Sequence, residues 1–339
     1  MTSSPTCNRR SPDAQVVARM TAGSPLPQLA DIRAAAARIA PHVLRTPVLT
    51  GRGHLDELVG AQLFFKCENF QRVGAFKFRG AMNAVLSLTG AELKNGVATH
   101  SSGNHAAAIA LAAQLMGISA IVVMPSGSSA VKVEAVRGYG AEVRFCANNQ
   151  AARAAALEQV VRDSGATFIH PYDDWQVICG QGTAALELHE EIPGLNLLLV
   201  PVGGGGLLSG SAITTKALAP ATRMVAVEPA GADDAFLSLQ SGRIVPSIDP
   251  KTIADGLRTA LGVRNFRVIQ EHVDAIVTVS EAAIVEAMRL LWSRLKIVVE
   301  PSAAVPFAAL LEHKVDVSGA RVGIILSGGN VDLDALPWR

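Results

Sequence analysis

The chain has 339 residues, of which 49% are hydrophobic and 17% are charged, so it is long enough for two domains and can bury a large core. Its formal net charge of +1 at pH 7 provides no general positive field for nucleic acid or a membrane surface. No apolar run reaches the roughly 20 residues of a membrane span, and the run at 195–202 has the length of a buried strand.

The first 28 residues differ from the rest because they are rich in Ser, Pro and Thr. Arg9 and Arg10 are not followed by an apolar segment, so we expect a disordered tail rather than a signal peptide. A transit peptide and a translation start at Met20 remain open alternatives. Four cysteines without a CxxC pair predict reduced thiols and a cytoplasmic protein; they are Cys7, Cys67, Cys146 and Cys179.

After the tail, helical and strand-like patterns alternate, separated by short Gly and Pro turns. Helices are predicted at 31–39, 81–88, 106–116, 130–139, 150–164, 181–191, 207–219, 281–295 and 302–313. Strands are predicted at 62–67, 96–100, 119–124, 142–146, 167–170, 195–202, 224–227, 275–279 and 322–326. This alternation is typical of an α/β protein with parallel sheets.

One lysine, Lys77, stands between Phe76 and Phe78 at the start of a predicted helix. Apolar surroundings disfavour the ammonium form, so the pKa falls and the amine becomes nucleophilic. A nucleophilic amine is what imine formation with an aldehyde requires. The alternative is a lysine that packs its stem on the two rings and keeps its charge in water.

Four glycines, Gly203, Gly204, Gly205 and Gly206, follow the predicted strand 195–202 and precede a helix that begins at Leu207. Glycines there let backbone N–H groups approach an anion at a helix N-terminus. The dinucleotide pattern GxGxxG fails in every frame, and no Lys-Ser/Thr follows as in a Walker A loop, so a single phosphate fits better. A turn that merely packs closely remains the alternative.

Two further strings occupy turns at the ends of predicted strands. Ser101-Ser102-Gly103-Asn104-His105 lies between a strand and a helix, where capping by Ser102 or Asn104 would also explain the residue types. Ser327-Gly328-Gly329-Asn330 follows the strand 322–326, where an ordinary β-turn is the alternative. Each string is weak evidence by itself.

Together the four strings, in this order, resemble the serine/threonine dehydratase and serine racemase group of the fold-type II pyridoxal-phosphate (PLP) enzymes over roughly residues 29–336. The resemblance implies two α/β domains with the cofactor in the cleft between them. Residues 29–95 and 174–339 would form the large cofactor-binding domain. Residues 96–173 would form a small mobile domain.

The resemblance also implies roles for individual residues. Lys77 would carry the cofactor, and Ser102 would be a second acid/base in a racemase. The expected cofactor contacts are Phe76, Lys77, Asn104, Gly203, Gly204, Gly205, Gly206, Leu207 and Ser327. The expected substrate contacts are Ser101, Ser102, Gly103, Asn104, His105 and Arg153. Ala75 and Ala107 depart from the commonest family pattern. The alanine at 75 could give the wall of the phosphate or substrate site another shape. The alanine at 107 puts a contact with a nucleotide effector at that position in doubt.

The string from Glu228 to Asp234 is a candidate metal loop. Two carboxylates six residues apart in a Pro/Gly loop provide hard oxygen ligands suited to Mg²⁺, Mn²⁺ or Ca²⁺. Because cation-dependent members of the family carry a similar string, the resemblance implies Glu228, the Ala232 carbonyl and Asp234 as ligands. A solvated acidic loop is the alternative.

The sequence therefore predicts a PLP-dependent ammonia-lyase that dehydrates serine, threonine or 3-hydroxyaspartate to a keto acid and ammonia. Ser327 favours elimination, because a hydroxyl at the pyridine nitrogen leaves the ring a weaker electron sink than a carboxylate would. An amino-acid racemase and a non-catalytic PLP-binding protein are the alternatives. We expect a cytoplasmic homodimer with a small amino acid as its substrate and with no nucleic-acid or membrane partner.

Overall fold

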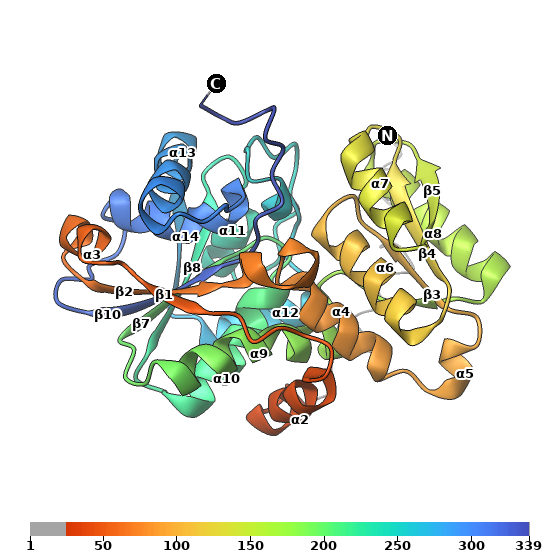
Figure 1. The fold of residues 1–339 in the computed structure, drawn as a ribbon, viewed down its shortest axis with the longest axis horizontal. Helices are drawn as coiled ribbons and strands as arrows, with labels where there is room; N and C mark the ends of the chain where they lie inside the picture. Colours follow the sequence, from red (N-terminus) through yellow and green to blue (C-terminus); the bar gives the residue numbers. More distant parts are fainter. Residues whose placement is uncertain (1–24, 339) are drawn as a thin grey trace, which may run out of the picture.

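The computed structural model describes residues 25–338 and contains two β-sheets covered by helices (Figure 1). Cys7, Met20 and most of the predicted tail lie outside the described residues. Residues 25–28, which the sequence analysis assigned to the tail, lie next to the folded core. Leu26 packs on the core, and Gln28 precedes helix α2 (Leu29–Ile39), so these four residues belong to the folded chain.

The larger sheet has six strands in the order β1-β2-β10-β7-β8-β9. All pairs are parallel except β1 with β2 at one edge. The strands are β1 (Val48–Thr50), β2 (Gln62–Cys67), β7 (Leu197–Pro201), β8 (Arg223–Pro229), β9 (Ala275–Val279) and β10 (Arg321–Leu326). No helix within residues 25–338 is both long and apolar enough to cross a membrane.

The inner strands of this sheet are continuous apolar runs because both of their faces are buried. In β7, Leu197 and Leu199 face one core while Leu198 and Val200 face another. The first core includes side chains of α3 (His54–Val59), α13 (Glu281–Leu290) and α14 (Pro301–Leu311). The second includes side chains of α2, α9 (Trp175–Glu191), α10 (Gly206–Leu218), α11 (Asp234–Ser241) and α12 (Val263–His272). The result is a three-layer helix–sheet–helix body.

The smaller sheet has four parallel strands in the order β5-β4-β3-β6. The strands are β3 (Val97–His100), β4 (Ala120–Pro125), β5 (Glu142–Cys146) and β6 (Thr167–Phe168). Helices α6 (Asn104–Met116) and α7 (Ala130–Gly138) pack on one face, and α8 (Gln150–Ser164) packs on the other. Helix α4 (Lys77–Leu86) lies between the two sheets and packs its apolar side chains on α6 (Figure 1).

Most predicted elements are present, but several bounds differ. Helix α4 begins at Lys77 rather than at 81, and α9 begins at Trp175 rather than at 181, where Asp174 accepts hydrogen bonds from two N–H groups of its first turn. Strand β6 ends at Phe168, and the helix predicted at 281–295 ends at Leu290 in a π-helical turn. The sequence analysis missed β1, α3, α5 (Gly90–Leu93), α11 and α12.

Candidate functional site

The lysine string and the Ser327 turn form one structure although they lie far apart in the chain. The Phe76 N–H donates to the carbonyl of Ser327 at 3.0 Å, and the Gly329 N–H donates to the carbonyl of Gly74 at 2.9 Å. Ser327 is buried directly after β10, in the middle of the larger sheet. The backbone of Ser327 is therefore held beside Phe76, the residue that precedes Lys77.

Lys77 is the first residue of α4 and is half-buried. Its Nζ donates to the carbonyl of Pro171 at 2.9 Å and lies 5.1 Å from the centroid of the Phe76 ring. Burial lowers the pKa of Lys77 to about 8, and the carboxylate of Glu300 acts in the opposite direction. The lowered pKa, in the direction that the sequence predicted, leaves roughly a tenth of this amine uncharged and nucleophilic at pH 7.

The Ser101–His105 loop connects β3 to α6 and is tied to the Ser327 turn. The Asn104 amide donates to both oxygens of Glu300 at 3.1 Å, and its own oxygen accepts from Asn330 at 2.9 Å. Helix α6 has Gly103 at its N-cap and no side-chain cap, so capping does not explain Ser102 or Asn104. The side chain of Asn104 instead joins the small sheet to the large one.

Sequence reasoning missed Glu300, which precedes α14. This residue is buried, and its N–H donates to the carbonyl of Gly328 at 3.0 Å. Burial raises the pKa of Glu300 to about 7, while the hydrogen bond from Asn104 acts in the opposite direction. The Glu-Pro pair reads as an ordinary helix start, so the sequence contained no signal that this carboxyl faces Asn104.

The glycine loop lies between β7 and the N-terminus of α10, and all four glycines are buried. Gly205 has a φ of +95°, which favours glycine. A Cβ on Gly204 would come within 2.4 Å of the Tyr172 ring, and one on Gly203 would come within 2.9 Å of the Leu257 Cα. Close packing thus accounts for part of the glycine run, and the 13-residue helix that follows directs the positive end of its dipole toward this loop.

The segment from His170 to Asp173 links the lysine to the glycine loop, which the sequence analysis did not foresee. The Pro171 carbonyl accepts from Lys77, and the next residue, Tyr172, packs its ring on Gly204. The Asp173 carboxylate accepts from the N–H groups of Val263 at 3.2 Å and Arg264 at 2.8 Å, at the start of α12. Together with the contacts described above, the segment 170–173 thereby connects all four predicted strings.

Arg153 and three histidines occupy the small-sheet side of this region. The Arg153 Nε and both ring nitrogens of His105 are buried without a hydrogen-bond partner among residues 25–338. Burial lowers the pKa of His100 to about 4, with a further contribution from Arg153, and lowers the pKa of His170 to about 3. Burial and the nearby Lys77 hold the pKa of His105 well below its usual value. The histidines are therefore neutral, and Arg153 supplies a cationic group beside them.

The candidate metal loop contains two buried carboxyl groups. Glu228 accepts from the N–H groups of Ala235 at 3.1 Å and Phe236 at 3.0 Å, whereas both oxygens of Asp234 lack a partner within the described part of the chain. Burial raises the pKa of Glu228 to about 9 and that of Asp234 to about 6. No group of three or more His, Cys, Asp or Glu side chains in residues 25–338 forms a metal site, so a site here would need the Ala232 carbonyl and water.

Comparison with known proteins agrees with these contacts. The family model described as "Pyridoxal-phosphate dependent enzyme" matches residues 39–328. A beta-hydroxyaspartate dehydratase from Paracoccus denitrificans is 49% identical over 93% of this chain and 99% of the relative. An L-threo-3-hydroxyaspartate ammonia-lyase from Saccharomyces cerevisiae is 49% identical over 91% of this chain and 94% of the relative.

A solved structure of serine racemase from Dictyostelium discoideum superposes with a TM-score of 0.86 and 46% identity, covering 90% of this chain and 99% of that one. This likeness confirms the predicted fold class, and the family match establishes PLP as the family cofactor. The chain belongs to the pyridoxal-phosphate dependent enzymes of fold type II, in the branch that contains the serine racemases and the hydroxyaspartate dehydratases.

Proposed function

We propose that this protein eliminates water from a β-hydroxy-α-amino acid, producing a keto acid and ammonia. The observation that carries the proposal is a series of contacts that begins at Lys77, whose amine donates to the Pro171 carbonyl. The neighbouring Phe76 N–H donates to Ser327, and Asn330 of the same turn donates to Asn104. Tyr172, which follows Pro171, packs on Gly204 of the glycine loop. The relatives named as hydroxyaspartate dehydratase and ammonia-lyase support the same reaction.

The residues present fit PLP. Lys77, with its lowered pKa, would hold the aldehyde, and the N–H groups of the glycine loop and of Leu207 would hold the phosphate. Ser327 would face the pyridine nitrogen, Asn104 the phenolic oxygen, and Phe76 the ring. When bound, PLP supplies an electron sink for the electrons left when the substrate loses its α-proton. Ser327 offers a hydroxyl rather than a carboxylate, and this favours loss of a β-substituent.

Lys77 also serves as the base of the reaction. Its pKa of about 8 leaves part of the amine unprotonated near neutral pH, so Nζ can accept the α-proton. The Pro171 carbonyl accepts one N–H of this amine and so orients the lone pair. Loss of the β-hydroxyl as water then leaves an enamine, which hydrolyses to the keto acid and ammonia.

We further propose 3-hydroxyaspartate, rather than serine or threonine, as the preferred substrate. Arg153 has a buried Nε without a hydrogen-bond partner in residues 25–338, and the neighbouring histidines are neutral, so a second carboxylate could pair with Arg153 at little desolvation cost. Serine and threonine carry no such group. Ser101, Gly103 and His105 would line the α-carboxylate side of the site.

Racemisation of an amino acid is the second candidate. The observation that favours it is Ser102, which lies in the loop held to the Ser327 turn by Asn104 and Asn330. A hydroxyl there could return a proton to the face of the α-carbon opposite Lys77. A relative from Dictyostelium discoideum named serine racemase is 46% identical to this chain.

A divalent cation at Glu228, the Ala232 carbonyl and Asp234 is a further part of the proposal. Burial raises the pKa values of Glu228 and Asp234, and a cation between these two carboxyl groups would stabilise their charged forms. Mg²⁺ and Mn²⁺ suit this set because both accept hard oxygen ligands and retain several waters.

We also propose that residues 96–173 move as a small domain against residues 29–95 and 174–339. All four strands of the smaller sheet lie between Val97 and Phe168, which supports this division. Helix α4 complicates the division because it packs on α6 although it precedes residue 96. The boundary of the moving part therefore lies along α4.

A homodimer and a cytoplasmic location complete the proposal. Phe70 is 45% exposed and Val298 is 46% exposed, and the hydrogen bond from Asn69 to the Val298 carbonyl brings their segments together into an apolar surface suited to a second copy. The cysteines at 67, 146 and 179 are free thiols, as in a reducing compartment. Light scattering of the purified protein measures the oligomeric state directly.

The test of the central proposal is a product assay with PLP-loaded protein and pure enantiomers of serine, threonine and 3-hydroxyaspartate. Keto acid formation measures elimination, and appearance of the opposite enantiomer measures racemisation. We expect keto acid from a 3-hydroxyaspartate isomer at the highest kcat/KM. If protein with PLP bound at Lys77 converts none of the panel, elimination of β-hydroxy amino acids is the wrong reaction.

A further inference from the structure

A cluster of four charged side chains is buried behind the candidate site. Arg79, Lys66 and Glu68 have no exposed surface, and the Glu187 side chain is 13% exposed. Arg79 belongs to α4, and Glu187 belongs to α9. Lys66 belongs to β2, and Glu68 belongs to the 3₁₀ turn Glu68–Phe70 that follows β2. Two cations face two carboxylates, so the formal charges cancel. None of these residues has a role in the function proposed above.

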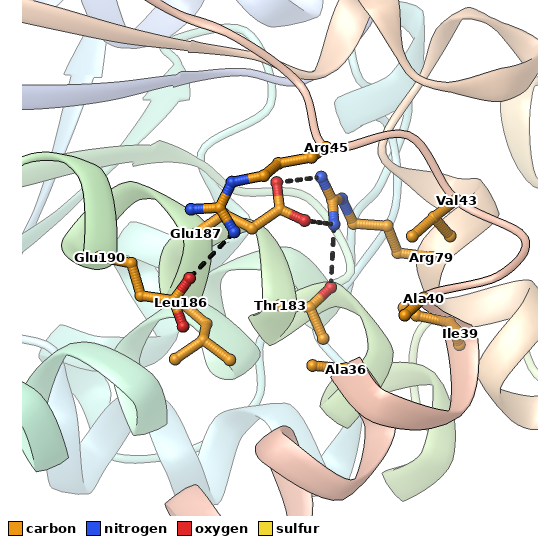
Figure 2. Close-up of a pocket in the computed structure, with 10 residues that line it drawn as sticks. All are labelled: Ala36, Ile39, Ala40, Val43, Arg45, Arg79, Thr183, Leu186, Glu187 and Glu190. Carbon is orange, nitrogen blue, oxygen red and sulfur yellow. Dashed lines mark hydrogen bonds and ion pairs between the residues drawn. The ribbon is translucent and has the colours of Figure 1, made fainter.

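The guanidinium of Arg79 is saturated with hydrogen bonds. It donates to both oxygens of Glu68 at 2.7 and 2.8 Å, and to both oxygens of Glu187 at 2.7 and 2.8 Å. Its fifth N–H lies 3.2 Å from the hydroxyl of Thr183. A guanidinium has five N–H donors, so each has an acceptor in a fixed direction. Figure 2 shows the contacts with Glu187 and Thr183.

The two carboxylates of the cluster also accept hydrogen bonds from side chains other than Arg79. Glu68 accepts from the Thr46 hydroxyl at 2.6 Å, and Glu187 accepts from Lys66 Nζ at 2.6 Å. Lys66 also donates to the Thr46 carbonyl at 2.7 Å. The position of Arg79 is therefore set by the connector before β1, by β2 and by α9 together.

The same stretch of α4 meets α9 at a very close crossing. A Cβ on Gly180 would lie 2.6 Å from the Arg79 carbonyl oxygen, so the two helix backbones almost touch. The Gly80 N–H, one of the first four of α4, donates to the Gln181 side chain at 3.1 Å. Farther along, the Asn83 amide donates to the Gln176 carbonyl at 2.7 Å.

Arg79 stands two residues after Lys77 in the first turn of α4. At 3.6 residues per turn the two side chains leave the helix roughly 200° apart, so Arg79 points away from the site while its backbone shares a turn with the lysine. The apolar side of α4 packs on α6 of the small sheet. The helix that carries Lys77 thus contacts a part of the chain proposed to move, while Arg79 ties it to the larger sheet.

The energetics indicate that the buried cluster fixes the orientation of its side chains rather than adding stability to the fold. Taking charges out of water is costly, and replacing a buried ion cluster by apolar side chains of similar size is often neutral or stabilising. Such a cluster does fix orientation, because bidentate pairs tolerate little rotation.

We propose that Arg79 is a positioning residue that fixes the first turn of α4 to the larger sheet and so holds Lys77 Nζ in register with the Pro171 carbonyl and the Ser327 turn. This inference rests on the proposed role of Lys77. A displacement of about 1 Å at a reacting group can cost about 10²-fold in rate, so a looser α4 should lower kcat far more than it changes KM.

The test is the double variant Arg79→Met/Glu68→Met, which removes one cation and one carboxylate and leaves the Lys66–Glu187 pair intact. The matched control is Arg45→Met/Glu190→Met. That exposed ion pair lines a cavity of about 290 Å³ together with Arg79 and Glu187 (Figure 2). Two readouts are compared with wild type: steady-state kinetics, and the pH-dependent rate at which formaldehyde and cyanoborohydride methylate Lys77 in PLP-free protein, read by mass spectrometry.

We expect the Arg79 double variant to fold, to lose about 10- to 100-fold in kcat with little change in KM, and to show a shifted pH profile of Lys77 methylation. The control should match wild type in all three. An Arg79 double variant that folds and keeps the wild-type kcat and methylation profile would show that the cluster does not position Lys77.

If the double variant does not fold, Arg79→Lys tests the proposal, because lysine keeps the charge but loses the bidentate hydrogen bonds of the guanidinium. A folded Arg79→Lys protein with a lowered kcat and an altered methylation profile supports the proposal, and one that behaves as wild type overturns it. If neither variant folds, Arg79 serves stability alone and the proposal is wrong. Failure of the proposed function is distinguishable, because wild type itself would then convert none of the panel, whereas the methylation profile of Lys77 still compares the variants with wild type.

Discussion

Two polar regions of this protein, each built from buried charged groups, differ in how far the chain satisfies them. Behind α4, every N–H of Arg79 has an acceptor from the protein itself. Around the candidate site, Arg153, His105 and Asp234 bury polar atoms that residues 25–338 leave without a partner. Buried polar groups are normally paired, so such exceptions require an explanation.

We interpret this difference as one between side chains that hold helices and strands in place and side chains that are available to a ligand. The Arg79 guanidinium has no N–H donor left with which to bind a small molecule. Unpaired polar atoms beside a nucleophilic lysine, by contrast, are free to bind a cofactor or a substrate. Changes in the unsatisfied region should therefore alter binding and turnover.

Lys77→Ala should have the largest effect in the unsatisfied region. The variant should fold, bind PLP weakly and show no turnover, because it lacks both the amine that holds the cofactor and the proposed base. Borohydride reduction followed by peptide mapping should tag Lys77 in wild type and nothing in the variant. Full activity of Lys77→Ala would exclude PLP chemistry at this residue.

Ser102→Ala should separate the two candidate reactions. Elimination from one L-substrate needs only Lys77 as a base, whereas racemisation needs a proton donor on the opposite face. Loss of an acid/base group typically costs about 10²–10⁴-fold in the step it serves. We expect any racemase activity to fall by that amount while keto acid formation persists. An equal fall in both rates would indicate that Ser102 positions the substrate.

The extent to which the sequence predicted this molecule follows from the range of the interactions involved. Strands such as β7 and helices such as α8 were readable because their burial and periodicity are local patterns. Strand β1 was missed because it has three residues and is not buried. Helix α12 was missed because its N-cap residue is Gly262, which has no side chain to mark the start of a helix.

The candidate site shows the same division. The strings around Lys77, Asn104 and Ser327 each lie in one stretch of sequence, so a resemblance could identify them. Glu300 and Pro171 act through partners 196 and 94 residues away, and nothing in their own neighbourhoods marks them. The early start of α4 likewise depends on Gln181 of another helix, which satisfies the Gly80 N–H.

Removal of a divalent cation should affect the whole fold as well as the rate. A ligand that binds only the folded state stabilises it by about 2.7 kcal/mol when present at a hundred times its Kd. Chelation should therefore lower the melting temperature and the activity of wild type, and Mg²⁺ or Mn²⁺ should restore both. Asp234→Ala should abolish this response. A wild-type protein whose rate and melting temperature are both unchanged by chelator has no such site.

Arg153→Lys should have the smallest effect and is the most specific test of the comparison. Lysine keeps the charge of Arg153 but loses the bidentate geometry, and hydrogen bonds to charged groups are worth about 1.5–3 kcal/mol. We therefore expect kcat/KM to fall about 10-fold for 3-hydroxyaspartate and to change little for serine. Arg162→Lys is the control, because Arg162 belongs to the same helix, is exposed, and pairs with Glu158. An equal loss for both substrates would mean that Arg153 contacts the carboxylate common to all amino acids, and the preference for a dicarboxylate would have to arise elsewhere.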